Sequence, residues 1–459
     1  MDGFSSFFAI LMLCAGVFLT VRINFFQFTH LGCAIKTALG LGQKRSARSK
    51  QKFDASGVTP FQALASALGG SIGTANIAGV ASAIAIGGAG AVFYMWLAAL
   101  VGMGVKFCEI VLALRYREKR GGQWCGGAML YIEKGFRKSN TGSRFLQSVS
   151  KPLAAGFALF GLLASAVGTP LVQSNTIAMS VNDAVLLFLP KAEQKTVCII
   201  AGAATAALVG IVILGGIQRI GKASEIIVPF MAIGYIAICI IVLSRFGSRI
   251  LPAFRDIFSG ALGIKQAVGG AAGFGAARAL RIGMARGVYS NEAGVGSAPM
   301  AHACANTNDP VKQGMYGIFE VFADTIVMCT MTALVVLASG IPLQAGGEVS
   351  GTSIALRAFS TVLPERTTGI FLAVSMLLFA YTSLLGWAVY GMQCAKYLFG
   401  KRAQLPFCIL YTVLTFAGAL MKVDFVWTAG ETLNYLMAAP NMLALLVLNR
   451  EVRRETAFA

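Results

Sequence analysis

The chain has 459 residues, of which 56% are hydrophobic and only 12% are charged. A soluble protein of this size carries about twice that share of charge, and the mean hydropathy here is +0.72. Apolar stretches of roughly 18 or more residues recur along the whole length, which excludes an ordinary soluble domain and indicates a multi-pass α-helical membrane protein.

The formal net charge of +19 raises the question of a nucleic-acid partner. Of the 38 cationic side chains, 15 cluster in two loops, 36–52 and 115–151. Short basic loops beside apolar spans are what the positive-inside rule predicts. We therefore attribute the charge to membrane topology and expect no nucleic-acid partner.

Eleven spans are predicted. One N-terminal span is followed by two sets of five, which puts the N-terminus outside and the C-terminus in the cytoplasm. The chain then divides into an N-terminal helix with its basic loop (1–56), a first repeat (57–245), a second repeat (246–450) and a cytoplasmic tail (451–459). The predicted spans are 4–28, 61–86, 91–114, 152–189, 196–215, 224–244, 258–284, 315–340, 368–399, 404–421 and 425–448.

Each set of five opens with an apolar stretch that is crowded with glycine. Interrupted spans in matching positions of two halves are typical of transporters built from inverted repeats. The alternative is that these glycines only allow close helix packing. The glycines are Gly69, Gly70, Gly73 and Gly79 in the first stretch and Gly269, Gly270, Gly273 and Gly275 in the second.

A helix that breaks at mid-membrane offers bare N–H groups that suit a carboxylate and free carbonyl groups that suit a hard cation such as sodium. Thr382 and Ser383 are adjacent hydroxyls in a later apolar span and would add oxygen ligands. The alternative for both is a hydrogen bond to a carbonyl of their own helix. Trp387 lies one turn from Ser383 and would wall the same pocket.

Four ionisable residues lie in or near spans and are functional candidates for that reason. Lys106 and Glu109 are three residues apart, so we expect a neutralising pair near the cytoplasmic end. Glu320 and Asp324 share a helix face and would carry protons if transport were proton-coupled. No catalytic pair is recognisable, and the polar residues form a local pocket rather than the continuous path of a channel, so we expect neither an enzyme nor a channel.

Three separated blocks resemble the alanine or glycine:cation symporter family, the sodium/alanine symporters of the amino acid–polyamine–cation superfamily. Two weaker similarities, near Met129 and near the C-terminus, extend the resemblance over nearly the whole chain. The three blocks are TPFQALASALGGSIGTANIAGV from Thr59, RGVYSNEAGVGSAPMAHA from Arg286 and LLFAYTSLLGWAVYG from Leu377.

The resemblance implies an all-α membrane fold like that of the bacterial leucine transporter. This is a five-plus-five inverted repeat, here with one additional N-terminal transmembrane helix. The implied sodium ligands are the backbone oxygens of Gly69, Ile72 and Phe379 with the hydroxyls of Thr382 and Ser383. The implied substrate-binding residues are Ser71, Thr74, Ala75, Asn76, Gln173, Gly270, Phe274 and Trp387.

The sequence departs from the family pattern in places. Ala75 replaces the second glycine of the Gly-x-Gly-Asn turn, which leaves the exact substrate open. Met392 and Gln393 stand where relatives tend to carry an acidic residue. On the expected topology Arg286 and Glu292 face the cytoplasm, where they form either part of an inner gate or a structured loop.

These observations predict a sodium-coupled symporter of small neutral amino acids, alanine or glycine, in a prokaryotic plasma membrane. It would function as a monomer by alternating access, with sodium as the coupling ion and no other cofactor. The alternatives are coupling to protons and a preference for another neutral amino acid such as glutamine or serine.

Overall fold

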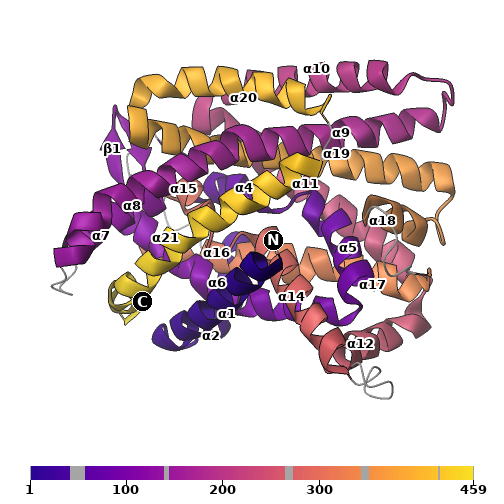
Figure 1. Cartoon of the computed structure of the whole chain (residues 1–459), viewed down its shortest axis with the longest axis horizontal. Helices are drawn as coiled ribbons and strands as arrows, with labels where there is room; N and C mark the ends of the chain where they lie inside the picture. Colours follow the sequence, from indigo (N-terminus) through magenta and orange to yellow (C-terminus); the bar gives the residue numbers. More distant parts are fainter. Residues whose placement is uncertain are drawn as a thin grey trace.

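The computed structural model describes residues 2–41, 57–138, 144–263, 272–342, 351–421 and 424–457, without the side chains of residues 2–9, 272–274 and 424–431. Over these ranges the protein is helical apart from one short hairpin, and the longest helices run along the long axis of the molecule (Figure 1). The strands of the hairpin are β1 (Glu118–Arg120) and β2 (Gln123–Cys125), which pair antiparallel.

The first half of the chain contains two interrupted helices. One breaks between α4 and α5, and the other passes through a π-helical segment, η2. The elements are α1 (Asp2–Arg22), α2 (Phe26–Thr29), α3 (Leu31–Ala38), α4 (Pro60–Ser71), η1 (Thr74–Asn76), α5 (Ala78–Gly87), α6 (Gly90–Tyr116), α7 (Ala128–Lys138), α8 (Arg144–Leu163), η2 (Ala164–Gly168), α9 (Thr169–Leu186), α10 (Gln194–Ile213) and α11 (Gly216–Ser244).

The second half contains a break between α14 and α15 and a second π-helical segment, η3. The elements are α12 (Gly247–Ala261), α14 (Ala272–Asn291), α15 (Ala298–His302), α16 (Pro310–Val321), η3 (Phe322–Cys329), α17 (Thr330–Ser339), α18 (Gly351–Phe359), α19 (Glu365–Phe399), η4 (Lys401–Ala403), α20 (Gln404–Gly418) and α21 (Asp424–Ala457).

Seven helices within the described ranges are long and apolar enough to cross a membrane. The sequence predicted eleven spans. The difference arises partly because a broken helix, such as α4 with α5, does not provide one uninterrupted apolar segment. The seven helices are Gly90–Tyr116, Arg144–Leu186, Gln194–Ile213, Gly216–Ser244, Pro310–Ser339, Glu365–Phe399 and Thr432–Ala457.

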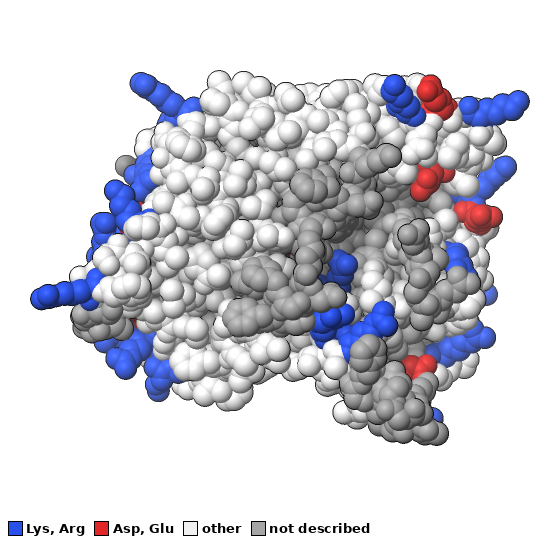
Figure 2. Space-filling model, viewed as in Figure 1, with Lys and Arg blue, Asp and Glu red and all other residues white. Residues whose placement is uncertain are grey.

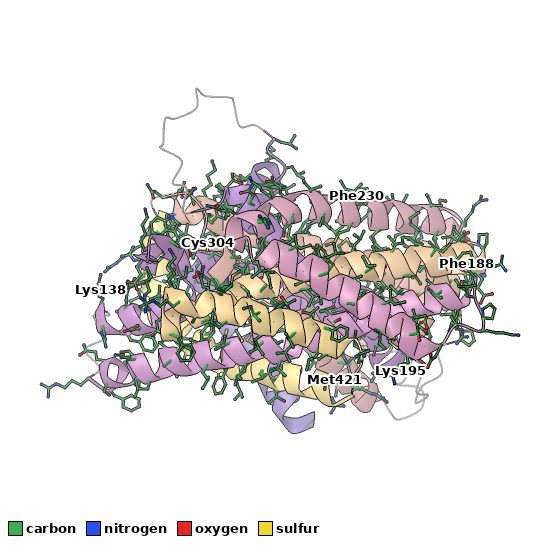
Figure 3. All side chains as sticks on the ribbon, turned by 90° about the horizontal axis from the view of Figure 1, so that it is seen from above. Lys138, Phe188, Lys195, Phe230, Cys304 and Met421 are labelled. Carbon is green, nitrogen blue, oxygen red and sulfur yellow. The ribbon has the colours of Figure 1, made fainter. Side chains whose placement is uncertain are left out.

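The outer surface is apolar around the middle of the molecule. Ile226, Phe230 and Ile233 of α11 are about 70% exposed, and Phe230 points outward in Figure 3. In Figure 2 most charged side chains of the visible face lie at its two ends, with an uncharged band between them. A chain that places large apolar side chains outside and charges at two ends is built for a bilayer.

Local sequence fixes where the first interrupted helix begins. Thr59 Oγ1 accepts a hydrogen bond from the Gln62 amide at 3.1 Å, and the Gln62 side chain accepts one from the Thr59 amide at 3.1 Å. Pro60 occupies the first helical position, where a missing N–H costs nothing. This reciprocal cap starts α4 at a defined residue.

Candidate functional site

The first predicted break is confirmed. α4 ends at Ser71, the 3₁₀ turn η1 covers Thr74–Asn76, and α5 begins at Ala78. The side chain of Asn76 folds back so that its Oδ1 accepts a hydrogen bond from the Gly73 amide at 2.8 Å. Asn76 is completely buried, and its side chain accepts a hydrogen bond from a backbone amide that has no helical partner at the break.

A second break lies between Asn291 and α15. The sequence predicted a break among Gly269–Gly275. Gly273 and Gly275 lie in α14, which runs unbroken from Ala272 to Asn291, whereas Gly269 and Gly270 lie outside the described ranges. At the break after Asn291, Glu292, Gly294 and Gly296 adopt φ of 54°, 86° and 84°, a left-handed conformation that ends an α-helix.

The two broken helices run antiparallel and side by side. Val58, just before α4, exchanges backbone hydrogen bonds with Cys304 (3.1 Å) and Asn306 (2.8 Å), just after α15. On the other side of the breaks, Asn76 bonds to Ser290 at 3.2 Å. A Cβ added to Gly87 of α5 would lie 3.1 Å from Ile282 Cβ of α14. The start of each broken helix therefore lies beside the end of the other.

The π-helical segment η3 contacts both breaks. Asn76 donates to Asp324 Oδ1 at 2.7 Å, and Ser290 donates to Asp324 Oδ2 at 2.8 Å. Asn291 caps its own break by accepting the Ala293 amide at 3.0 Å, and it donates to Thr325 Oγ1 at 3.2 Å. Each break is thus held by an asparagine that also bonds to η3.

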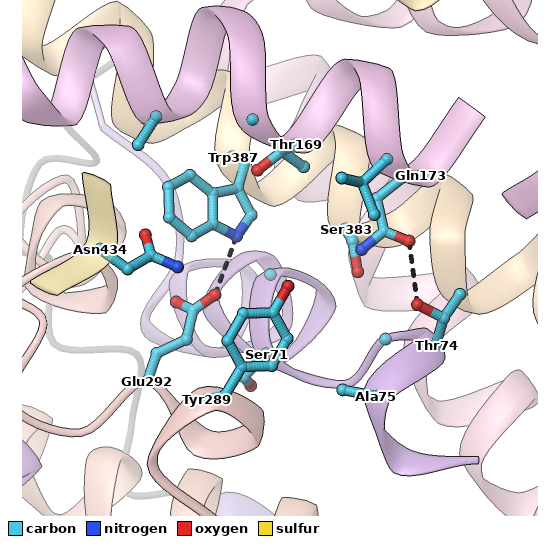
Figure 4. A pocket seen from close by; sticks show the side chains of 15 residues that line it. Ser71, Thr74, Ala75, Thr169, Gln173, Tyr289, Glu292, Ser383, Trp387 and Asn434 are labelled. Carbon is cyan, nitrogen blue, oxygen red and sulfur yellow. Dashed lines mark hydrogen bonds between the residues drawn. The ribbon is translucent and has the colours of Figure 1, made fainter. Parts of the chain in front are cut away.

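A cavity lies where the two breaks meet η2, α9 and α19 (Figure 4). It encloses about 580 Å³ of empty space, its open mouth included. The lining residues are Gly70, Ser71, Gly73, Thr74, Ala75, Ala164, Gly168, Thr169, Val172, Gln173, Tyr289, Glu292, Ser383, Trp387 and Asn434.

The cavity brings together five of the predicted substrate residues, which come from three separate parts of the chain. Thr74 donates to Gln173 Oε1 at 3.4 Å, the contact drawn at one side of Figure 4. Asn76 does not line the cavity, because its side chain serves Gly73 and Asp324. Gly270 lies outside the described residues, as does the side chain of Phe274. The five lining residues are Ser71, Thr74, Ala75, Gln173 and Trp387.

Glu292 is the most important residue that sequence reasoning misplaced. It was expected to face the cytoplasm in a gate or a loop, but it lines the cavity, where Trp387 Nε1 donates to its Oε1 at 2.8 Å and Ser297 donates to its Oε2 at 2.6 Å. Arg286, its predicted gate partner, lies within α14 and does not line the cavity. The sequence signal for this site was Asn-Glu followed closely by Gly-x-Gly, in the block that starts at Arg286.

Tyr289, Asn434 and Thr169 also line the cavity and were not predicted. The buried Oδ1 of Asn434 has no hydrogen-bond partner among the described residues. In Figure 4 it lies beside Glu292 and Trp387, at the opposite side of the cavity from Thr74 and Gln173. The cavity therefore has an acidic end and an end built from hydroxyl, amide and backbone groups.

The predicted sodium ligands lie on α4, at the first break and on α19, and α4 packs against α19. A Cβ added to Gly69 would lie 3.2 Å from Thr382 O, and one added to Gly73 would lie 2.7 Å from Ser383 Oγ. Thr382 Oγ1 and Ser383 Oγ each donate to Phe379 O at 3.0 Å. These are the bonds to their own helix that the alternative reading predicted. Because a hydroxyl has one proton and two lone pairs, both oxygens can still coordinate a cation through a lone pair.

No group of three or more His, Cys, Asp or Glu side chains within the described ranges is arranged to hold a metal ion.

The buried ionisable residues pair differently from the prediction. Lys106 donates to Glu320 Oε1 at 3.2 Å rather than pairing with Glu109, and both partners are fully buried. Glu320 Oε2 lies 3.2 Å from His302 Nε2. Glu109 instead accepts from Asn441 Nδ2 at 2.5 Å. These contacts join α6, α15, α16 and α21, so the charges serve tertiary contacts rather than one helix face.

The sequence matches the sodium:alanine symporter family over residues 3–457. The sodium/alanine symporter AgcS of Methanococcus maripaludis is 38% identical over 451 residues, covering 97% of this chain and 92% of the relative. A probable sodium/glutamine symporter of Bacillus subtilis, GlnT, is 34% identical over 445 residues, covering 96% and 85%.

Among solved structures, MhsT in complex with L-phenylalanine aligns with a TM-score of 0.53 over 84% of this chain and 88% of MhsT. The two sequences are only 14% identical, so this similarity concerns the fold, which is of the leucine-transporter type. From its sequence match over nearly the whole length and its apolar helices, the chain belongs to the sodium:alanine symporter family and is a multi-pass membrane transporter rather than an enzyme.

Proposed function

We propose that the protein couples sodium entry to the uptake of a small neutral amino acid by alternating access. The observation that carries this proposal is the cavity between two antiparallel broken helices, with one acidic end and one end of hydroxyl and backbone groups. A zwitterionic amino acid presents opposite charges a few ångströms apart, which such a cavity complements.

The substrate ammonium would bind at the acidic end. Glu292 is about 5% exposed, and each of its carboxylate oxygens accepts one hydrogen bond from protein and keeps a further lone pair. Asn434 Oδ1 has no partner among the described residues and adds a second acceptor. A buried carboxylate without a cation is costly, so an ammonium group here stabilises the site as well as the substrate.

The substrate carboxylate would bind at the other end. Thr74 and Ala75 open the turn η1, and the first residues of a helical turn have amides without a partner inside it. Sodium would lie beside them, held by backbone oxygens of Gly69, Ile72 and Phe379 and by Thr382 and Ser383. The membrane potential adds about 2.3 kcal/mol per charge per 100 mV to the accumulation of substrate.

Alanine or glycine is the proposed substrate, because relatives are named for sodium and alanine and because Ala75 and Trp387 narrow the cavity. Glutamine, after which another relative is named, or serine is the alternative. The protein would be a monomer in a prokaryotic plasma membrane with its N-terminus outside, and residues 57–245 and 246–450 would form the two inverted repeats.

Proton coupling is the second candidate. The observation that favours it is Asp324, a fully buried carboxylate that bonds to Asn76 at one break and to Ser290 at the end of α14. A proton on this group would change the hydrogen bonds of both broken helices.

Radiolabelled alanine uptake into proteoliposomes tests the proposal, with an inward sodium gradient compared with potassium at equal pH. Unlabelled glycine, serine and glutamine compete in parallel. Thr382→Val and Ser383→Ala should weaken the response to sodium by about tenfold or more, because each removes one oxygen ligand.

Thr415→Val is the matched control. Thr415 is also buried and bonds to a carbonyl of its own helix, Tyr411 O at 2.8 Å, but it lies in α20 and does not line the cavity. Equal sodium responses in Thr382→Val and Thr415→Val would reject the sodium site. Uptake driven by a pH gradient and indifferent to sodium would favour the proton-coupled candidate.

A further inference from the structure

A second cavity opens at the end of the molecule that carries the hairpin of β1 and β2. It lies between the α10–α11 turn, the α19–α20 turn and β2, and encloses about 1510 Å³, its open mouth included. Its lining is Gln123, Trp124, Ile213, Leu214, Gly215, Gly216, Ile217, Val389, Met392, Gln393, Lys396, Lys401, Arg402, Gln404, Leu405 and Cys408. None of these residues lines the first cavity, which lies between the two helix breaks.

Lys396 is a buried cation on the wall of this second cavity. It is only 1% exposed, and its Nζ donates to Trp124 O at 2.8 Å. Among the described residues no carboxylate lies within 4 Å of its ammonium group. A buried ammonium with one neutral acceptor and no counter-ion is energetically unfavourable, so an anion bound beside Lys396 would stabilise it.

Two further polar atoms on the same wall have no partner. The indole Nε1 of Trp124 is buried and donates no hydrogen bond within the described ranges. The Oε1 of Gln393 is also buried and accepts no hydrogen bond there. Buried donors and acceptors are nearly always satisfied in folded proteins. An anionic oxygen would accept from Lys396 and Trp124, and a hydroxyl group on the same ligand would donate to Gln393.

The surroundings of the cavity are cationic. Lys401 and Arg402 are exposed at its rim. The carboxylate of Glu118 in β1 already forms ion pairs with Lys134 and with Arg120. The Arg120 Nε lies 2.5 Å from Glu118 Oε1. Burial raises the pKa of Glu118, but the hydrogen bonds from Lys134 and Arg120 outweigh it and hold the pKa below its ordinary value. This carboxylate therefore stays ionised, with its own partners.

Part of the lining of the cavity is apolar and continues onto the outer surface. Val389 and Ile213 are buried within it, whereas Leu214 and Leu405 are 56% and 59% exposed. Leu214 follows the last residue of α10 and Leu405 is the second residue of α20, so both lie at helix ends beside the mouth of the cavity. A cationic pocket that opens onto an apolar surface matches a lipid with an anionic headgroup.

We propose that this second cavity binds the headgroup of an anionic, hydroxyl-bearing phospholipid such as phosphatidylglycerol. The phosphate accepts hydrogen bonds from Lys396 and Trp124 and faces Lys401 and Arg402. The headgroup hydroxyl donates to Gln393, and an acyl chain lies along Leu214 and Leu405.

Thermal unfolding of the full-length protein in phosphatidylcholine nanodiscs, with and without phosphatidylglycerol, tests this proposal. We expect phosphatidylglycerol to raise the unfolding midpoint of the wild type but not that of Lys396→Met. Trp124→Phe removes the indole N–H and leaves a smaller aromatic ring beneath the Arg117 guanidinium, which lies 4.0 Å from the ring centroid of Trp124. It should bind phosphatidylglycerol about tenfold more weakly.

Lys222→Met is the matched control, because Lys222 is an exposed lysine of α11 outside the cavity. It should keep the full response, so an equal loss in this variant would mean general attraction to a charged membrane and reject the site. An unchanged response in Lys396→Met, or none in the wild type, would also overturn the proposal. An equal rise with inorganic phosphate in phosphatidylcholine alone would replace the lipid by a free anion.

Discussion

The side-chain amide of Asn76 donates to Asp324 Oδ1 at 2.7 Å, which ties the first helix break to the π-helical segment of another helix. The second carboxylate oxygen accepts from Ser290 at 2.8 Å and from Thr325 at 2.7 Å. A π-helical turn is a local departure from α-helix that recurs at functional sites. Here it lets one carboxylate serve both broken helices.

Asp324→Ala should therefore be strongly destabilising. Three buried donors lose their acceptor, and we expect a loss of about 2–4 kcal/mol in the free energy of unfolding. Asp324→Asn keeps the shape and one acceptor, so its loss should be smaller. Unfolding in detergent measures both variants. If both variants matched the wild type, the Asp324 hydrogen bonds would not hold the breaks.

The same variant separates the two coupling ions. Asp324→Asn removes the titratable carboxyl but leaves the cavity lining intact. On the proposed function it still takes up alanine in response to a sodium gradient. Loss of a pH-driven component alone would assign proton movement to Asp324.

Trp387→Phe should weaken substrate binding. It removes the N–H that donates to Glu292 at 2.8 Å while keeping an aromatic wall. The carboxylate is then held less firmly toward the substrate ammonium, and we expect about a tenfold higher KM for alanine. Trp96→Phe is the control, because Trp96 donates to Thr330 at 2.8 Å away from the cavity. Similar kinetics for the two variants would argue against a role of Glu292.

Gly73→Ala should abolish uptake, whereas Gly79→Ala should not. A methyl group at Gly73 would lie 2.7 Å from Ser383 Oγ, at the proposed sodium site. At Gly79 its nearest neighbour is Ala75 Cβ at 3.4 Å, which is an ordinary contact. Uptake by the two alanine variants, normalised to the amount of folded protein, checks this contrast. Normal uptake by Gly73→Ala would contradict the close approach of the first break to α19.

Lys106 and Glu320 should be strongly coupled. Removing either partner leaves the other as a buried charge, so Lys106→Met and Glu320→Gln should each cost about 3–5 kcal/mol of stability. The double variant should cost clearly less than the sum, because no charge is stranded. A thermodynamic cycle from chemical unfolding measures the coupling, and strictly additive losses would mean that the 3.2 Å contact contributes little.

The sequence predicted the first break because glycine and polar residues coincide around Gly73 and Asn76. The break after Asn291 was not predicted, because glycine density alone was weighed. Gly273 and Gly275 remain helical, whereas Gly294 and Gly296 adopt positive φ after a capping asparagine. Glycine permits a break, but a side chain that takes over the backbone hydrogen bonds is what fixes it.

The hydrogen-bond and ion-pair partners of the buried side chains could not be predicted from the sequence, for a different reason. Lys106 shares a helix face with Glu109, yet its partner Glu320 lies 214 positions away along the chain. Glu292 meets Trp387 only because α14 ends beside α19. Periodicity reports which face of a helix is apolar, but not which helix will cover it.

The backbone contact between Val58 and the residues after α15 has a mechanical consequence. Hydrogen bonds run in both directions, and Arg117 adds further bonds to the carbonyl oxygens of Ala303, Ala305 and Thr307. The two half-helices α4 and α15 are thereby joined by buried backbone contacts at the start of one and the end of the other. We expect α4 and α15 to move together as one rigid unit in any conformational change of the transporter.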